Sequence, residues 1–352
     1  MTNARDESQY RTGIEDGLTP LSPLDPSQTR SVDELVRAMS QTAFGGRRLG
    51  DAANVLEAMI RDRDCFRVVT ISGAMTVAKQ GLILCEMIDR GWVHAVVTTG
   101  ALMTHGLSEG AGLLHFQHKN DMEDEELYQK GYNRVYDTIE LEKNLDDVER
   151  IMQRALADVP EDTTLSSRLI CQLLGRDLEK HTSTRAILKS ALTHDVPIYV
   201  PAFTDSELGL DLSIHNHLRA KEGKPAYRFD PFLDLDDFAG RIRQHDSIGI
   251  FTIGGGVPRN WAQQVGPYLE ILRSRLGSTD PIRRYRYAVR ICPEPEHWGG
   301  LSGCGYSEGV SWGKFVPESE GGLFAEVFSD ATIAWPIIVR AVIERLENQP
   351  VT

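Results

Sequence analysis

Hydrophobic positions along the chain follow two different periods. Apolar residues at helical spacing predict a helix from Val32 to Met39 and a second from Ala52 to Met59. Further on, short apolar runs without polar alternation predict six strands, over residues 66–71, 93–98, 197–202, 248–253, 287–291 and 323–328. Helical patterns follow several of these runs, among them residues 77–88 and 333–346. Strands of this kind, interleaved with helices, predict a parallel sheet covered on both faces.

The predicted fold class is therefore α/β, with a doubly wound, mostly parallel, Rossmann-like sheet. In such sheets ligands bind beyond the carboxyl ends of the strands. Small and polar residues gather at those ends: Ser72-Gly73, Thr98-Thr99-Gly100, Thr204-Asp205, Gly254-Gly255-Gly256 and Asp330. We expect these segments to lie along one edge of the sheet and to form the functional site.

Residues 1–30 differ from the rest of the chain. They are polar, contain Pro20, Pro23 and Pro26, and show no sustained apolar period, which is typical of a tail or an arm. Such an arm could pack on a neighbouring subunit. Residues 31–352 are expected to form a single catalytic domain, a length that α/β enzymes often reach as one unit.

Composition narrows the functional classes. The 352 residues carry a net charge of -13, which argues against a nucleic-acid partner and favours small cationic ligands. Five cysteines without Cys-x-x-Cys spacing indicate reduced thiols. No apolar stretch is long enough to span a bilayer, so we expect a cytoplasmic protein without membrane contact. The acidic stretch between residues 119 and 153 is interpreted as a solvated helix face.

Lys314 is the candidate for covalent chemistry. It follows a glycine-rich run at residues 299–305 and stands two residues after Trp312. A lysine amine is nucleophilic only when neutral, and its usual pKa of about 10.4 keeps it protonated at neutral pH. Burial against an indole would lower that pKa, as in enzymes that form lysine imines. A lysine in a glycine-rich loop is more often a solvated surface residue, and the chemistry alone leaves both interpretations open.

The remaining polar candidates have two interpretations each. The triple glycine at 254–256 lets a backbone approach a pyrophosphate or ribose, or forms a tight turn. Asp205 and Asp330 could accept hydrogen bonds from ribose hydroxyls, or they could cap helices. His115-x-x-His118, with His105 nearby in sequence, could face a metal ion from one helix, but no carboxylate or cysteine spacing supports it. We expect packing or capping histidines and no metal.

Five segments in order, spread over residues 40–345, resemble the deoxyhypusine synthase family and in particular its bacterial deoxyhypusine synthase-like members. They are residues 96–100, 131–135, 201–205 followed by Leu208-Gly209, 252–258, and the Ser-Trp-Gly-Lys at 311–314 with Glu308 before it and Asp330-Ala331 after it. The resemblance implies an NAD-dependent transferase of alkyl groups, of the EC 2.5.1 type. It also implies a homotetramer with active sites at the dimer interface.

The implied reaction begins when a hydride passes to NAD from the carbon beside the secondary amine of spermidine. Neutral Lys314 then takes the aminobutyl group as an imine, and 1,3-diaminopropane leaves. An acceptor amine displaces the lysine and the hydride returns. The implied cofactor site comprises Met75, Thr76, Val77, Ala78, Lys79, Thr99, Gly100, Ala101, Asp205, Gly254, Gly255, Gly256, Glu294, Asp330 and Ala331. The implied amine-binding positions are Thr104, His105, Asp211, Asn260, Trp298, Ser302, Glu308 and Trp312.

The sequence departs from the family at amine-binding positions. Thr104 and His105 stand where the family has an acidic pair, Asn260 and Trp261 where it has two histidines, Trp298 and Leu301 where it has aspartates, and Leu210 where it has another aspartate, which neighbouring Asp211 could replace. A buried ammonium left without a carboxylate costs several kcal/mol. These losses favour a small-amine acceptor, such as putrescine giving homospermidine, over a protein lysine.

Two alternatives remain open. The protein could be a deoxyhypusine synthase that modifies a protein lysine, or a non-catalytic homologue that senses NAD or amines. An ordinary dehydrogenase fits poorly, because the Gly-x-Gly-x-x-Gly fingerprint is absent.

Overall fold

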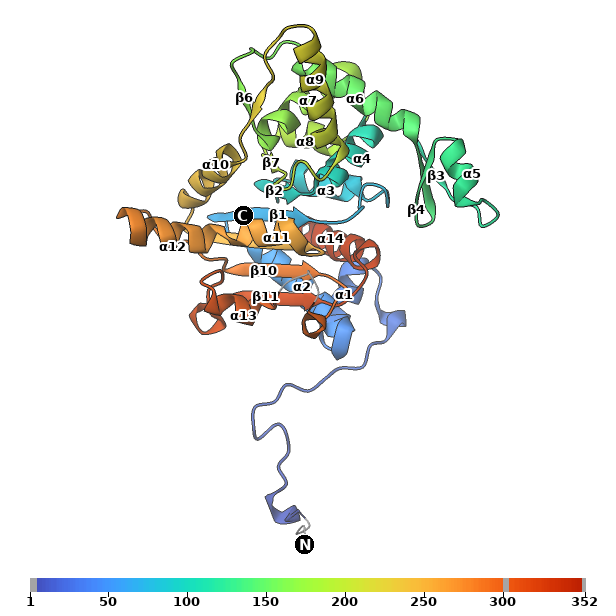
Figure 1. The fold of residues 1–352 in the computed structure, drawn as a ribbon. Coiled ribbons are helices and arrows are strands. Elements are labelled where there is room, and N and C mark those ends of the chain that lie inside the picture. The colour runs from blue at the N-terminus through green and yellow to red at the C-terminus, as the bar shows by residue number, and fades with distance from the viewer. Residues whose placement is uncertain (1–4, 300–303, 350–352) are drawn as a thin grey trace.

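The computed structural model describes residues 5–299 and 304–349. Its centre is a parallel sheet of six strands in the order β11-β10-β9-β1-β2-β7 (Figure 1). The strands are β1 Cys65–Ile71, β2 Ala95–Thr98, β7 Ile198–Tyr199, β9 Ser247–Ile253, β10 Tyr287–Ile291 and β11 Leu323–Val327. Every neighbouring pair of strands in this sheet is parallel. The predicted α/β fold is confirmed.

Helices cover both faces of this sheet, which explains why its strands lack polar alternation. Phe66 and Val68 of β1 face one cluster of buried residues and Val69 and Ile71 face the other. The first cluster packs under α10 Phe232–Arg243, α11 Gly256–Gln263, α12 Val265–Leu276 and α13 Tyr306–Ser311. The second packs under α1 Val32–Ser40, α2 Phe44–Arg61, α3 Gly81–Asp89 and α14 Ala331–Asn348.

A second group of helices lies beyond the β2 and β7 side of the sheet (Figure 1). These are α4 Gly100–Gly110, α6 Glu142–Leu156, α7 Ser167–His181, α8 Ile187–Thr193 and α9 Glu207–Lys221, beside the short parallel pair β6 Thr164–Leu165 and β8 Arg228–Phe229. An antiparallel sheet projects from this group with α5 Asp124–Gln129; its strands are β3 His115–Gln117, β5 Thr138–Leu141 and β4 Tyr132–Val135. The acidic first turn of α5 is exposed, as expected. Short 3-10 helices cover Glu7–Gln9, Pro26–Gln28, Glu296–Trp298 and Glu318–Glu320.

Several predicted elements are shorter than the sequence pattern indicated; the strand predicted over 93–98, for example, begins at Ala95. The strand predicted over 197–202 pairs only at Ile198 and Tyr199, because the Val200 amide donates to Ser167 Oγ (2.8 Å) instead of to a strand. The helix predicted over 77–88 starts at Gly81, because Lys79 adopts a left-handed φ of 61°. Val77 is buried in the loop before that helix.

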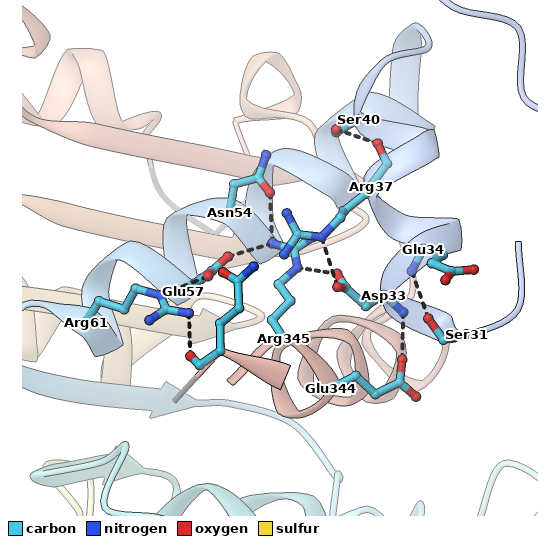
Figure 2. Close-up of polar contacts among 11 residues, drawn as sticks. Ser31, Asp33, Glu34, Arg37, Ser40, Asn54, Glu57, Arg61, Glu344 and Arg345 are labelled. Carbon is cyan, nitrogen blue, oxygen red and sulfur yellow. Dashed lines mark hydrogen bonds and ion pairs between the residues drawn. The ribbon is translucent and has the colours of Figure 1, made fainter. Parts of the chain in front are cut away.

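The first and last helices are joined through Arg345 of α14, which is 1% exposed (Figure 2). Its guanidinium contacts Asp33 of α1, and its Nη1 donates to Asn54 Oδ1 (2.8 Å) and Glu57 Oε2 (3.2 Å) of α2. Asp33 also pairs with Arg37 at 2.9 Å. Ion pairs and hydrogen bonds therefore link segments about three hundred residues apart.

The N-terminal segment, described from residue 5, extends away from this body (Figure 1). Most of its side chains up to residue 30 are exposed. Among the described residues, no helix is both long enough and apolar enough to cross a membrane.

Candidate active site

Lys314 is held beneath the surface by its own backbone. The Gly309 carbonyl accepts a hydrogen bond from the Lys314 amide (3.1 Å), and the Lys314 carbonyl accepts one from Tyr285, just before β10 (2.9 Å). Gly313, at φ 69°, makes the turn after α13 that brings the lysine to this position. The lysine side chain is 7% exposed. The interpretation as a solvated loop lysine does not fit this placement.

The surroundings of Lys314 favour the neutral amine. Burial lowers the pKa of Lys314; the nearby Cys304 and Glu308 oppose that shift, while the guanidinium of Arg259 adds to it. Its Nζ lies 3.2 Å from Asn260 Oδ1, an uncharged acceptor, and 6.0 Å from the centre of the Trp312 ring. The amine thus has a hydrogen-bond partner that bears no charge.

The loops after the strands meet along one edge of the sheet, as parallel pairing predicts. The Gly255 amide donates to Ser72 Oγ (3.0 Å), joining the loops after β9 and β1, and the Gly254 amide donates to the Ile291 carbonyl at the end of β10 (2.8 Å). Gly254 adopts φ 81°, and a Cβ there would stand 2.3 Å from Ser72 Oγ. Only glycine fits at this position.

Lys314 lies close to this edge. Helix α11 begins at Gly256, and Asn260, which binds the amine, is four residues further on. At a rise of about 1.5 Å per residue, the two positions are only about 6 Å apart along the helix axis. The triple-glycine loop and the nucleophile predicted from sequence therefore belong to the same region of one chain.

The loops after β2 and β7 also touch. A Cβ on Gly100 would stand 2.0 Å from Ser206 Oγ, so this contact requires glycine. Thr99 caps α4 by accepting from the Leu102 amide (3.3 Å), and Ala101 follows in its first turn. Asp205 directly precedes Ser206, the N-cap residue of α9, so it does not itself cap that helix.

The remaining cofactor candidates lie in loops at the same edge. Thr76 is fully buried and donates to the Leu102 carbonyl (3.0 Å), so its side chain attaches the loop between β1 and α3 to α4. Asp330 accepts from the Thr332 amide (2.8 Å), and the capping interpretation of its side chain therefore holds. The others are Met75 and Glu294, which are partly exposed, Ala78 and Lys79, which are exposed, and Val77 and Ala331, which are buried.

The predicted amine-binding residues are only partly brought together. Asn260 and Trp312 lie at Lys314, and the partly exposed region around it includes Glu308, whose charge acts on the lysine. Trp298 and Trp312 are 70% and 63% exposed, so neither shields the amine from water in a single chain. Ser302 lies outside the described residues.

Three other candidates have partners other than Lys314 in the single chain. Thr104 is fully buried and donates to the Gly100 carbonyl (3.1 Å) within its own helix. Asp211 is buried between α9 and α6; burial, with Glu149 and Glu207 adding to it, raises its pKa to about 7. The neighbouring Leu210 is 58% exposed on the same helix. His105 contacts Glu140.

Two site residues escaped the sequence analysis. Arg259 is 2% exposed, donates to the Cys304 carbonyl (2.6 Å) and lies over the Tyr306 ring. Cys304 itself influences the charge on Lys314. No spacing signal marks either residue, because their proximity depends on how α13 folds back toward α11.

The family model for deoxyhypusine synthase matches residues 34–342. The chain belongs to the deoxyhypusine synthase family. It is 33% identical over 330 residues to the Methanosarcina acetivorans protein named "Probable deoxyhypusine synthase 2", covering 94% of this chain and 91% of that protein. It is 30% identical over 313 residues to the Chlorobaculum parvum protein named "Deoxyhypusine synthase-like protein", covering 88% and 85%.

The fold is also that of a deoxyhypusine synthase. A crystal structure of a proposed deoxyhypusine synthase from Entamoeba histolytica aligns with a TM-score of 0.59 and 14% identity, covering 92% of this chain and 97% of that one. At this identity the alignment establishes the shared fold alone. The deoxyhypusine synthase resemblance noted in the sequence is thus confirmed.

A substitution at Asn260 tests the electrostatics of this member of the deoxyhypusine synthase family. Asn260→Asp places a negative charge beside the Lys314 amine, which favours the ammonium and raises the lysine pKa. Less neutral amine is then present at neutral pH, so the pH at which amine-transfer activity reaches half its maximum should move upward. The pH dependence of the rate measures this shift.

Asn260→Ala is the matched control, because it removes the acceptor without adding charge. Its half-maximal pH should not rise. An Asn260→Asp profile that coincides with the Asn260→Ala profile would contradict the proposed neutral lysine.

Proposed function

We propose that the protein is an NAD-dependent transferase that carries an aminobutyl group from spermidine, or a related amine, on Lys314 to a small amine acceptor. The observation that carries this proposal is the burial of Lys314. Burial lowers the pKa of the lysine, and its amine makes a hydrogen bond to the uncharged side-chain amide of Asn260. Membership of the deoxyhypusine synthase family supplies the reaction class. Putrescine is the proposed acceptor, and homospermidine the proposed product.

The strand-end loops fit a dinucleotide. Gly254 and Gly256 have positive φ, and a Cβ on Gly256 would have no neighbour within 4 Å, which leaves open space at the start of α11. Gly254–Gly256, Asp205 and the loop 75–79 are proposed to hold NAD. When bound, NAD would accept one hydride and later return it.

Lys314 performs the transfer. The neutral amine adds to the oxidised carbon of the donor, the bond from that carbon to 1,3-diaminopropane breaks, and the aminobutyl group remains on the lysine as an imine. The acceptor amine then adds to the same carbon and releases Lys314. The product imine is reduced by the hydride removed at the start, so no net oxidation results.

Water must be kept away from the lysine imine. The exposure of Trp298 and Trp312 in one chain supports the proposal that a second subunit completes the site. A homotetramer with sites at the dimer interface would place those indoles under a neighbouring chain, where they would also stabilise ammonium groups.

The choice of a small amine as acceptor rests on the carboxylates that are missing from the amine-binding positions. Thr104 and His105 replace the family's acidic pair and neither side chain is a carboxylate, while the Asp211 carboxyl is buried on α9 near Glu149 and Glu207. A changed amine is favoured by the loss of the family's acidic pair at 104–105. The protein-lysine acceptor remains the second candidate, because the Methanosarcina relative is named a deoxyhypusine synthase.

An amine panel distinguishes these acceptors. We expect purified protein with NAD, spermidine and putrescine to form homospermidine and 1,3-diaminopropane in equal amounts, measured by mass spectrometry, without net NADH. Products that form only when a lysine-bearing acceptor protein is added would favour the second candidate. Accumulation of NADH, or no product from any amine pair, would contradict the proposed transfer.

A further inference from the structure

A cluster of two histidines and a glutamate lies between α4 and the small antiparallel sheet. His105 comes from α4, His115 from β3 and Glu140 from β5, where His115 and Glu140 are directly paired across the strands. One ligand atom from each residue lies within 4.8 Å of the other two. Sequence spacing pointed instead to His115 and His118 on one helix, but His115 starts a strand and His118 is not in this group.

The three side chains are buried and their facing atoms contact one another. The side chains of His115 and Glu140 are 1% exposed and that of His105 is 16% exposed. His105 Nδ1 contacts one oxygen of the Glu140 carboxylate, and His115 Nε2 lies 3.3 Å from the other without the alignment of a hydrogen bond. Two imidazoles therefore converge on one buried carboxylate, an arrangement that also suits a cation bound by all three side chains.

The separations suit a metal ion. Bonds of about 2.0–2.1 Å to nitrogen and oxygen place the ligand atoms of a tetrahedral ion about 3.3 Å apart. His115 Nε2 and Glu140 Oε1 are 3.3 Å apart, and His105 Nδ1 contacts the other carboxylate oxygen. Two imidazoles and one carboxylate form a ligand set that leaves a fourth position open.

We propose that His105, His115 and Glu140 bind one divalent transition-metal ion of the zinc class. Imidazole and carboxylate ligands suit first-row divalent cations better than Ca²⁺ or Mg²⁺, which prefer all-oxygen sites. None of the three ligands is among the contacts of the Lys314 amine within the described residues, so metal binding is measured without the amine-transfer assay.

Lys79 provides a further test of this site, because it contacts one of the proposed metal ligands. Its Nζ lies 2.8 Å from His115 Nδ1. An ammonium only donates, so Nδ1 accepts from it and the ring proton lies on Nε2. Metal binding at Nε2 requires that proton to move to Nδ1, and the lysine must then leave. Glu109, already 3.7 Å from Lys79 Nζ, is placed to receive it.

Metal binding to the full chain is measured by equilibrium dialysis against Zn²⁺ with elemental analysis, and by the visible spectrum after loading with Co²⁺. We expect one equivalent of Zn²⁺ per chain and a Co²⁺ spectrum typical of low coordination number. Glu140→Gln and His115→Gln should each weaken Zn²⁺ binding by at least about tenfold. Lys79→Met should tighten it, because it removes a cation and a competing donor from the His115 ring.

His118→Gln is the matched control, since it removes a neighbouring histidine that is not in the cluster. It should keep full metal binding. Circular dichroism and melting curves establish that each variant is folded, and Zn²⁺ should raise the melting temperature of the wild type but not of Glu140→Gln. Zn²⁺ binding that survives Glu140→Gln and His115→Gln in folded protein, or no stoichiometric binding by the wild type or by Lys79→Met, would overturn the proposal.

Discussion

Lys314→Ala is expected to abolish amine transfer. The substitution removes the proposed nucleophile, so neither 1,3-diaminopropane nor a new polyamine should form, a loss on the order of 10³-fold or more. Treatment of wild-type protein with NAD, spermidine and borohydride should leave an aminobutyl group on Lys314, which peptide mass spectrometry locates. The same treatment of Lys314→Ala should leave no adduct.

The matched control is Lys189→Ala. Lys189 of α8 is another lysine with little exposure, and its Nζ donates to the Thr182 carbonyl at the end of α7 (2.7 Å). We expect that variant to keep its activity. Undiminished transfer by Lys314→Ala would remove the lysine from the mechanism. A sensor without catalysis would bind amine or NAD yet give no borohydride adduct in the wild type.

The buried amine of Lys314 should also lower the free energy of unfolding of the protein. Its folded pKa is lower than its unfolded pKa, so at neutral pH the folded state holds the proton less readily than the unfolded state does. This destabilisation is complete below the folded pKa and fades as pH rises toward the unfolded value. Lys314→Met should therefore raise the melting temperature at neutral pH, and the gain should shrink in alkaline buffer.

Arg345→Met is expected to cause the largest loss of stability. It breaks the contacts to Asp33 and Glu57 and leaves their charges with fewer partners in a mostly buried place. Breaking a buried pair costs about 3–5 kcal/mol, and we expect about 3 kcal/mol here because Arg37 and Arg61 still pair with the two carboxylates. Urea unfolding of the variant and the wild type measures the difference.

Arg340→Met provides the comparison on the same helix. Arg340 pairs with Glu344 at 2.8 Å, but its side chain is 57% exposed. Such exposed pairs contribute about 0–1 kcal/mol. Equal losses of unfolding free energy in the two variants would show that the Arg345 contacts add nothing beyond those of a surface pair.

The sheet was predictable because its strands are buried on both faces. Phe66–Ile71 and Ile248–Ile253 consist mostly of apolar residues without polar alternation, and each is followed by small residues that meet at one edge. The antiparallel sheet near residue 133 was not predicted. All four residues of β4 are exposed, so no alternation of burial marks that strand in the sequence.

The site was predictable only where it depends on local sequence. Glycines at 254 and 256 have the positive φ that a turn into α11 needs, and the sequence marks them directly. The Lys314 contact with Asn260 joins residues 54 positions apart, and Glu140 meets His105 across 35 positions. Residue spacing carries no signal for such contacts, because they are set by how separate elements pack.

The hydrogen bonds and ion pairs of Arg345 limit how early the chain can fold during its synthesis. Helices α1 and α2 leave the ribosome early, yet their polar and apolar partners on α14 are synthesised about three hundred residues later. Contacts so distant in sequence form slowly. Helices α1 and α2 therefore cannot complete their polar contacts until translation of the chain is nearly finished.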